Sequence, residues 1–170
     1  PMKFLRGARE VQLLAFSTSS SASVMPLTMT TARDDFAVPE DTARLVVPLG
    51  ATINMDGTAL YQVVAAMFMI QFYDIDVSIV EILVLAATVI GASIGTPSTP
   101  GVGIVILATV LGSVGVPAGG VALVVGVDRI LDMSRTVVNV TGDLTACIVL
   151  NRWVGRTLTT DTSAVGSVAT

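Results

Sequence analysis

The sequence predicts an all-α membrane protein, and three observations lead to that prediction. Hydrophobic residues make up 52% of the 170 positions and charged residues only 13%, about half their usual share in a soluble domain. Several apolar stretches are interrupted by Gly, Pro, Ser and Thr. Residues 126–151 carry a narrow stripe of ionisable side chains on an otherwise apolar segment. Within a membrane, ionisable residues face a protein interior or a wet cavity and usually mark a substrate or ion path.

The stripe follows helical spacing. Its members are separated by 4, 3, 4 and 4 positions: Asp128, Asp132, Arg135, Asn139 and Asp143. At 3.6 residues per turn they fall within an arc of about 80°. We therefore expect one long helix over residues 118–152 with this stripe on its inner face.

Composition excludes several other classes. A net charge of −4 argues against a nucleic-acid partner. The single cysteine, Cys147, excludes an internal disulfide and a cysteine-based metal cluster, and the lack of histidine excludes a histidine zinc site. We expect the lipid bilayer as the surroundings of the chain and no organic cofactor.

Two hydroxyl-rich segments predict the tips of re-entrant helical hairpins. The first, STSSSAS at 17–23, lies between apolar flanks in a hairpin over residues 1–31. Its tip should be buried in protein or line a cavity, the alternative being a flexible linker. The second, GTPSTPGVG at 95–103, lies between arms too short for a full span. It predicts a hairpin over residues 77–116, and the alternative is a plain turn between two ordinary helices.

Residues 42–73 predict one helix interrupted near its middle. The polar segment Asn54-Met55-Asp56-Gly57-Thr58 would expose carbonyl groups and half-helix ends, which suit ion coordination. The alternative is an exposed Asx turn. Residues 32–44 predict an aqueous loop, and 74–76 a short acidic loop. The small, polar residues 157–170 predict a disordered tail.

The distribution of charge predicts the orientation. Three basic residues occur among the first nine positions, and Arg152 and Arg156 follow the last predicted helix. By the positive-inside rule both ends are cytoplasmic and the acidic loop at 74–76 lies outside. Two crossings and two hairpins that enter from opposite sides satisfy this arrangement, which is the inverted repeat of a secondary transporter in the cell membrane.

These segments resemble one family, the sodium-coupled glutamate/aspartate symporters, which include the excitatory amino acid transporters and bacterial relatives. The matching segments are STSSSASVMPLTM, PLGATINMDGTALYQ, ASIGTPSTPGVG and DRILDMSRTVVNVTGD. They occur in the family's order and cover nearly all of residues 1–152. The resemblance implies that residues 1–156 form the C-terminal half of a mobile transport domain. We interpret the sequence as a piece of a larger protein that forms a homotrimer through a scaffold outside this chain.

The resemblance also implies a substrate site. Arg135 would bind the side-chain carboxylate of an acidic amino acid, and Asp132 its ammonium group. The other implied substrate contacts are Ser20, Ser21, Thr58, Thr99, Gly103, Thr136 and Asn139. A planar guanidinium suits a carboxylate. The alternative is an internal Asp132–Arg135 ion pair, which can coexist with the substrate role.

Three sodium sites follow from the same resemblance, since sodium prefers hard oxygen ligands. The first uses Asp143 with carbonyl groups of Gly50, Asn54 and Asn139. The second uses carbonyl groups of Thr52, Met55, Ser93, Ile94 and Thr96. The third uses Asp56 and Asn54 with groups outside this chain. Proton-coupled relatives tend to carry asparagine in place of Asp143, so this aspartate favours sodium.

The chain departs from the family pattern at four positions. Archaeal members carry an arginine where this chain has Ser19, and animal members carry one where it has Met133. The second tip has Pro97 and Ser98 where small residues are commoner. These departures bear on substrate affinity and on the preference between aspartate and glutamate.

The function expected is sodium-coupled symport of acidic amino acids by alternating access, with the second hairpin as the outer gate. The protein would not be an enzyme. The alternatives are a dicarboxylate or neutral amino acid carrier of the same fold, an intramembrane aspartyl protease using Asp128, Asp132, Asp143 or Asp56, and a channel subunit.

Overall fold

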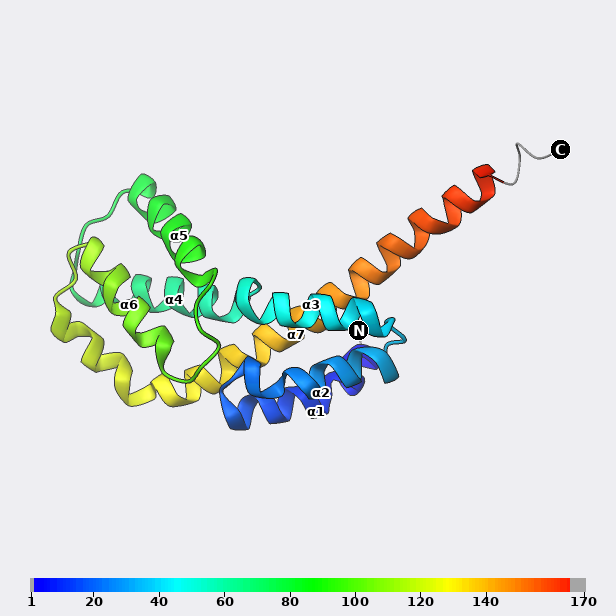
Figure 1. Cartoon of the computed structure of the whole chain (residues 1–170). Coiled ribbons are helices and arrows are strands. Elements are labelled where there is room, and N and C mark those ends of the chain that lie inside the picture. The colour runs from blue at the N-terminus through cyan, green and yellow to red at the C-terminus, as the bar shows by residue number, and fades with distance from the viewer. Residues whose placement is uncertain (1, 166–170) are drawn as a thin grey trace.

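The computed structural model describes the backbone of residues 2–165 and the side chains of residues 2–154 apart from Ser113 and Ala118. The described residues form helices joined by short connections (Figure 1). In chain order these are α1 (Met2–Thr18), α2 (Ser21–Asp34), α3 (Glu40–Ile53), α4 (Asp56–Phe72), α5 (Ile79–Ser93), α6 (Val102–Ser113), the 3-10 turn η1 (Ala118–Gly120) and α7 (Val121–Val165).

Helices α1 and α2 form a hairpin whose tip is only two residues long. Ser19 has φ 53°, a left-handed conformation that reverses the chain between the helices. Ser20 then caps α2, because its hydroxyl accepts a hydrogen bond from the backbone N–H of Ser23 at 3.3 Å. The hydroxyl-rich segment is thus a tight helical turn rather than a flexible linker.

Helices α5 and α6 form a second hairpin with a longer tip, residues 94–101. Gly95 and Gly101 have φ 79° and 83°, which glycine adopts without strain. At the other end of the hairpin, Ser78 and Glu81 form a capping box that starts α5.

The interruption between α3 and α4 is shorter than the sequence suggests. Only Asn54 and Met55 leave the helix, and Asp56 is already the first residue of α4. The expectation that the unwound segment extends through Thr58 is wrong. An aspartate in the first turn interacts favourably with the helix dipole, so Asp56 starts a helix rather than prolonging the break.

Two other boundaries also differ from the prediction. Helix α7 continues beyond residue 152 to Val165, so most of the predicted disordered tail is helical, and 166–170 lie outside the described residues. No proline occurs between 121 and 165, and none therefore interrupts the backbone hydrogen bonds. The predicted loop at 32–44 shrinks to residues 35–39, because Glu40 and Asp41 start α3 and favour its N-terminus.

The hairpins lie at opposite ends of the molecule, and their tips approach each other near its middle (Figure 1). One apolar core joins α1, α2 and α3 to the later part of α7. A second joins α4, α5 and α6 to the start of α7. The helix break, both tips and the middle of α7 meet between these two cores.

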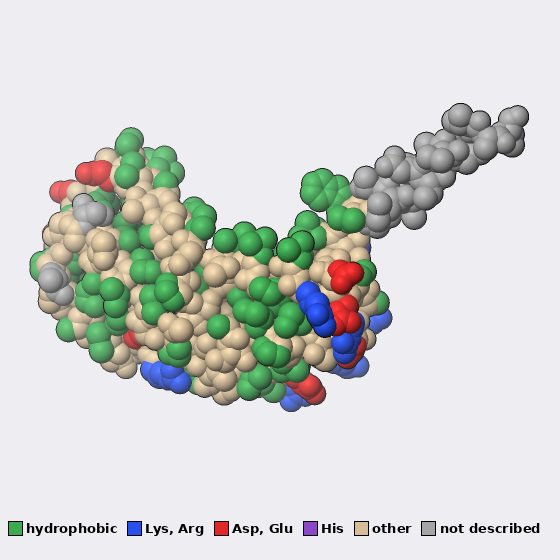
Figure 2. All heavy atoms as spheres, viewed as in Figure 1, with side chains coloured by type: hydrophobic (Ala, Val, Ile, Leu, Met, Phe, Trp, Pro, Cys, Tyr) green, Lys and Arg blue, Asp and Glu red, His purple; other side chains and the backbone are tan. Residues whose placement is uncertain are grey.

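The outer surface is strongly apolar. Large side chains such as Leu60, Phe68 and Leu83 are more than half exposed, whereas charged side chains gather mainly near the ends of the molecule (Figure 2). Among the described residues, one stretch, Glu40–Phe72, is long and apolar enough to cross a membrane by length and composition.

Candidate functional site

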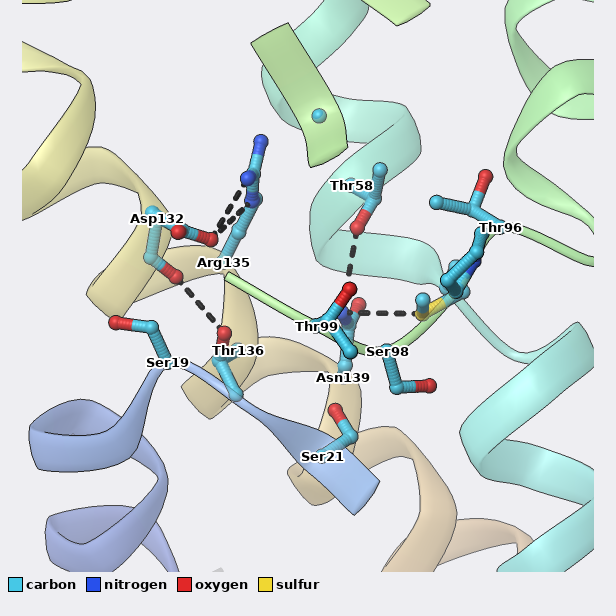
Figure 3. Close-up of a pocket in the computed structure, with 13 residues that line it drawn as sticks. Ser19, Ser21, Thr58, Thr96, Ser98, Thr99, Asp132, Arg135, Thr136 and Asn139 are labelled. Atoms are coloured by element: carbon cyan, nitrogen blue, oxygen red, sulfur yellow. Dashed lines mark hydrogen bonds and ion pairs between the residues drawn. The ribbon is translucent and has the colours of Figure 1, made fainter. Parts of the chain in front are cut away.

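The two hairpin tips and α7 enclose a small cavity of about 20 Å³, room for about one water molecule. Figure 3 shows Ser19 of the first tip, Ser21 at the start of α2, and Thr96, Ser98 and Thr99 of the second tip around Asp132, Arg135, Thr136 and Asn139 of α7. The lining residues are Ser19, Ser21, Met55, Thr58, Thr96, Pro97, Ser98, Thr99, Gly103, Asp132, Arg135, Thr136 and Asn139.

An ion pair between Asp132 and Arg135 dominates the cavity. Arg135 Nη2 lies 2.7 Å from Asp132 Oδ1, and both side chains are only 5% exposed. Arg135 Nε donates to the same oxygen at 2.8 Å, and the backbone N–H of Gly101 donates to Oδ2 at 3.0 Å. The charge of Asp132 is thus balanced by the guanidinium and by the start of α6, as a buried carboxylate requires.

Arg135 retains an unused donor despite this pairing. Its Nη1 is buried and has no hydrogen-bond partner among the described residues. The guanidinium also lies over the ring of Tyr61, 5.0 Å from the centroid, a cation–π arrangement. An anion with two oxygen atoms is the ligand that would satisfy the free donor of a planar guanidinium.

Two glycines allow other elements to approach Arg135. A Cβ at Gly103 would overlap the guanidinium, and one at Gly57 would overlap the carbonyl oxygen of Arg135. Gly103 therefore lets the second hairpin close over the side chain, and Gly57 lets α4 pack directly on α7.

Asn139 connects α7 to the helix break. Its side-chain oxygen accepts a hydrogen bond from Gly57 N–H at 2.8 Å. Its amide nitrogen lies 3.4 Å from Met55 Sδ and 3.3 Å from Thr58 Oγ1 (Figure 3). The start of α4 is thus held against the cavity-lining side of α7.

The two tips contact each other and α3. Ser20 Oγ donates to the carbonyl of Ser98 at 2.8 Å, and the Ser98 hydroxyl donates to the carbonyl of Ala51. Gly95 N–H donates to the carbonyl of Thr52 at 2.8 Å. Ser98 therefore links the first tip, the second tip and the end of α3.

Most of the predicted substrate residues meet at this cavity. Eight of the nine line it: Ser21, Thr58, Thr99, Gly103, Asp132, Arg135, Thr136 and Asn139. The exception is Ser20, whose hydroxyl caps α2 and bonds to Ser98. The internal Asp132–Arg135 pair that was the alternative reading is present as well.

Three of the four residues of the first predicted sodium site lie together: Gly50, Asn54 and Asp143. Asn54 Nδ2 donates to Asp143 Oδ1 at 3.0 Å, and a Cβ at Gly50 would overlap that same oxygen. The carbonyl of Gly50 accepts from Asn54 N–H at 2.8 Å. The side chain of Asn139 contacts α4, and the use of its backbone carbonyl group stays a prediction.

For the second and third predicted sodium sites, only some of the predicted ligand residues lie close together. Of the second set, Thr52 reaches the second tip through its bond from Gly95, and Met55, Ser93 and Thr96 are buried, whereas Ile94 is 54% exposed. Of the third, Asn54 and Asp56 both approach Gly142, where a Cβ would lie 2.7 Å and 2.9 Å from their side chains.

Sequence reasoning assigned no role to Tyr61, Gly142 or Ser19. The Tyr61 hydroxyl donates to Asp128 Oδ1 at 2.8 Å, which explains why Asp128 belongs to the stripe but does not line the cavity. Ser19 lines the cavity with a buried hydroxyl that has no partner among the described residues. The position of Ser19 in the hydroxyl-rich tip was the local signal for its place in the cavity, whereas nothing local indicated the contacts of Tyr61 and Gly142.

Opposed helical hairpins around an interrupted helix and a buried ion pair define a membrane-transporter class of fold. Residues 1–153 match the sodium:dicarboxylate symporter family, and the chain belongs to that family. It is a family of carriers rather than enzymes.

Individual relatives agree with this membership. The chain is 44% identical over 153 residues to a proton/sodium-glutamate symport protein of Bacillus subtilis, covering 90% of this chain and 35% of that protein. It is 44% identical over 143 residues to excitatory amino acid transporter 3 of Homo sapiens, covering 84% of this chain and 27% of that protein. It is 42% identical over 149 residues to a proton/glutamate-aspartate symporter of Escherichia coli, covering 88% of this chain and 34% of that protein. The chain therefore spans about a third of the length of these relatives.

Proposed function

We propose that the full-length protein is a symporter that takes up an acidic amino acid together with sodium. The observation that carries this proposal is the buried Asp132–Arg135 pair beside the two hairpin tips. Relatives with glutamate or glutamate-aspartate in their names support the substrate class.

The chemistry of the pair matches a zwitterionic diacid. When such a substrate enters, its side-chain carboxylate takes the place of Asp132 at Arg135, and its ammonium group takes the place of Arg135 at Asp132. Each buried charge then keeps a partner, which is required because an unpaired buried ion costs several kcal/mol. The unused Nη1 of Arg135 supplies a second donor for the carboxylate.

Neutral amino acids and dicarboxylates satisfy only one half of this exchange. A substrate without an ammonium group leaves Asp132 without a cation, and one without a side-chain carboxylate leaves Arg135 without an anion. Carriers of succinate or serine with the same fold are therefore the weaker alternatives.

Sodium is the proposed co-substrate. The carboxylate of Asp143 beside Gly50 and Asn54 offers hard oxygen ligands. Thr52, Ser93 and Thr96 lie where α3 meets the second tip, so cation binding there would depend on closure of that hairpin. Inward sodium movement yields about 2.3 kcal/mol per unit charge per 100 mV, which can drive uptake.

In this proposal the second hairpin is the outer gate and the domain moves as a unit after it closes. The hairpins are re-entrant and related as an inverted repeat, both ends of the chain face the cytoplasm, and trimerisation uses a region outside this chain. The alternating entry of α1–α2 and α5–α6 from opposite ends supports this topology (Figure 1).

The protease alternative needs two carboxylates that share a proton, and no hydrogen bond joins Asp56 or any other described carboxylate to a second one. Asp128 bonds to Tyr61, Asp132 to Arg135, and Asp143 to Asn54. Proton sharing between two carboxylates, which an aspartyl protease requires, has no support in this arrangement.

The test is uptake of labelled aspartate by the full-length protein in proteoliposomes with an imposed sodium gradient. Accumulation should require the gradient and should be inhibited by excess aspartate or glutamate but not by succinate or serine. Accumulation against the gradient of aspartate also excludes a channel. Equal inhibition by succinate would refute the proposed substrate class. Uptake without sodium would refute the proposed coupling ion.

A further inference from the structure

A second, larger concave site lies at the end of the molecule away from the second hairpin. It is a groove of about 780 Å³ between the start of α1, the loop after α2 and the later part of α7. One wall is apolar, and three basic side chains also line the groove: Lys3, Arg6 and Arg152. None of these residues belongs to the substrate or cation sites.

The apolar wall is fixed by aromatic packing. The rings of Phe4 and Phe36 lie 5.4 Å apart at 38°, and a Cβ at Gly7 would lie 2.9 Å from the Phe36 ring. Val38 N–H donates to the Ala32 carbonyl at 3.0 Å and holds the loop in place. The lining also includes the apolar side chains of Ile148 and Val149 from α7.

Among the described residues, the lining of the groove has more basic than acidic side chains. Of the described residues, no acid forms an ion pair with Lys3, Arg6 or Arg152, and Asp35 is the one carboxylate in the lining. By contrast, Arg33 is paired with its neighbour Asp34, and Arg44 is similarly paired with Glu40. The described lining of the groove therefore carries three basic side chains and one acidic side chain.

We propose that this groove binds an anionic phospholipid of the cytoplasmic leaflet. Its phosphodiester lies among the three cations, and an acyl chain follows the phenylalanine wall. Arginine and lysine bind phosphate oxygens, and basic pockets between membrane helices on the cytoplasmic side suit acidic headgroups. Trp153, 70% exposed beside Arg152, has the character of an aromatic residue at the membrane–water boundary. Free phosphate would use the cations but not the apolar wall.

The test uses the purified full-length protein, titrated with phosphatidylglycerol or phosphatidylcholine and followed by native mass spectrometry. Phosphatidylglycerol should be retained preferentially. Removing one cation near an anionic lipid weakens binding about fivefold. In the combined variant Lys3→Gln/Arg6→Gln/Arg152→Gln, retention of phosphatidylglycerol should therefore fall at least about twentyfold. The matched control Arg33→Gln/Arg44→Gln removes paired cations at the same end and should change retention by less than about twofold.

Asp35→Asn provides a test that does not depend on the combined variant folding. Removal of the single carboxylate should strengthen phosphatidylglycerol retention about fivefold. Four results would overturn the proposal: equal retention of phosphatidylcholine, displacement of the lipid by inorganic phosphate alone, equal losses in the combined and control variants, or insensitivity to Asp35→Asn. Insensitivity to every groove variant would indicate that a segment of the protein outside this chain covers the groove.

Discussion

The replacement Asp132→Asn tests how the ion pair selects its substrate. In the wild-type protein the carboxylate of Asp132 accepts from Arg135 through two nitrogen atoms and from Gly101 N–H. The amide of asparagine keeps the size of the side chain but removes its charge. Because both side chains are 5% exposed, Arg135 is left as a buried charge without an anion, at a cost of about 3–5 kcal/mol.

A carboxylate ligand should recover part of that cost. Succinate brings an anion to Arg135 and no ammonium group, so its affinity should rise at least about tenfold in the variant, equivalent to about 1.4 kcal/mol. Aspartate loses the partner of its ammonium group, and its affinity should fall at least about tenfold. The preference between the two ligands should therefore reverse.

The assay is thermal stabilisation of the full-length protein by each ligand in sodium, together with competition for labelled aspartate uptake. The matched control is Asp34→Asn, which removes an exposed, paired carboxylate and should leave both affinities unchanged. If Asp132→Asn still prefers aspartate to succinate, Asp132 does not bind the ammonium group and the reasoning fails.

Three further predictions concern close contacts around the site. Gly103→Ala places a Cβ on the guanidinium of Arg135, so aspartate affinity should fall at least about tenfold. Gly50→Ala overlaps Asp143 Oδ1 and should raise the sodium concentration for half-maximal uptake severalfold. Ser98→Ala removes a hydrogen bond to α3, so labelled aspartate should dissociate about twofold to tenfold faster.

Two other helical glycines provide matched controls. Gly91 and Gly112 have nothing within 4 Å of an added Cβ, so alanine at either position should leave affinity, sodium dependence and dissociation unchanged. Each prediction fails if its variant behaves like the wild-type protein. The results to look for are unchanged aspartate affinity in Gly103→Ala, unchanged sodium dependence in Gly50→Ala and unchanged aspartate dissociation in Ser98→Ala.

The helical architecture was predictable because its signals are local. Hydroxyl-rich tips between apolar arms indicated both hairpins, and helical spacing placed Asp132, Arg135 and Asn139 on one face of α7. The structure buries all of these side chains. The extent of the helix break was overestimated because the polarity of Asp56 and Gly57 does not reveal that both residues already belong to α4.

Contacts between distant segments were not predictable in the same way. The link from Ser20 through Ser98 to Ala51 spans both hairpins, and no periodicity reports it. Gly142 looks like an ordinary helical glycine until the side chains of Asn54 and Asp56 are placed over it. Tyr61 lies in an apolar stretch, so its bond to Asp128 required the packing of α4 on α7.

The most direct test is the structure of the full-length protein with aspartate and sodium bound. The account predicts that the Asp132–Arg135 contact is broken, with the aspartate side-chain carboxylate on Arg135 and its ammonium group on Asp132. Aspartate bound elsewhere while Asp132 and Arg135 remain 2.7 Å apart would contradict the account.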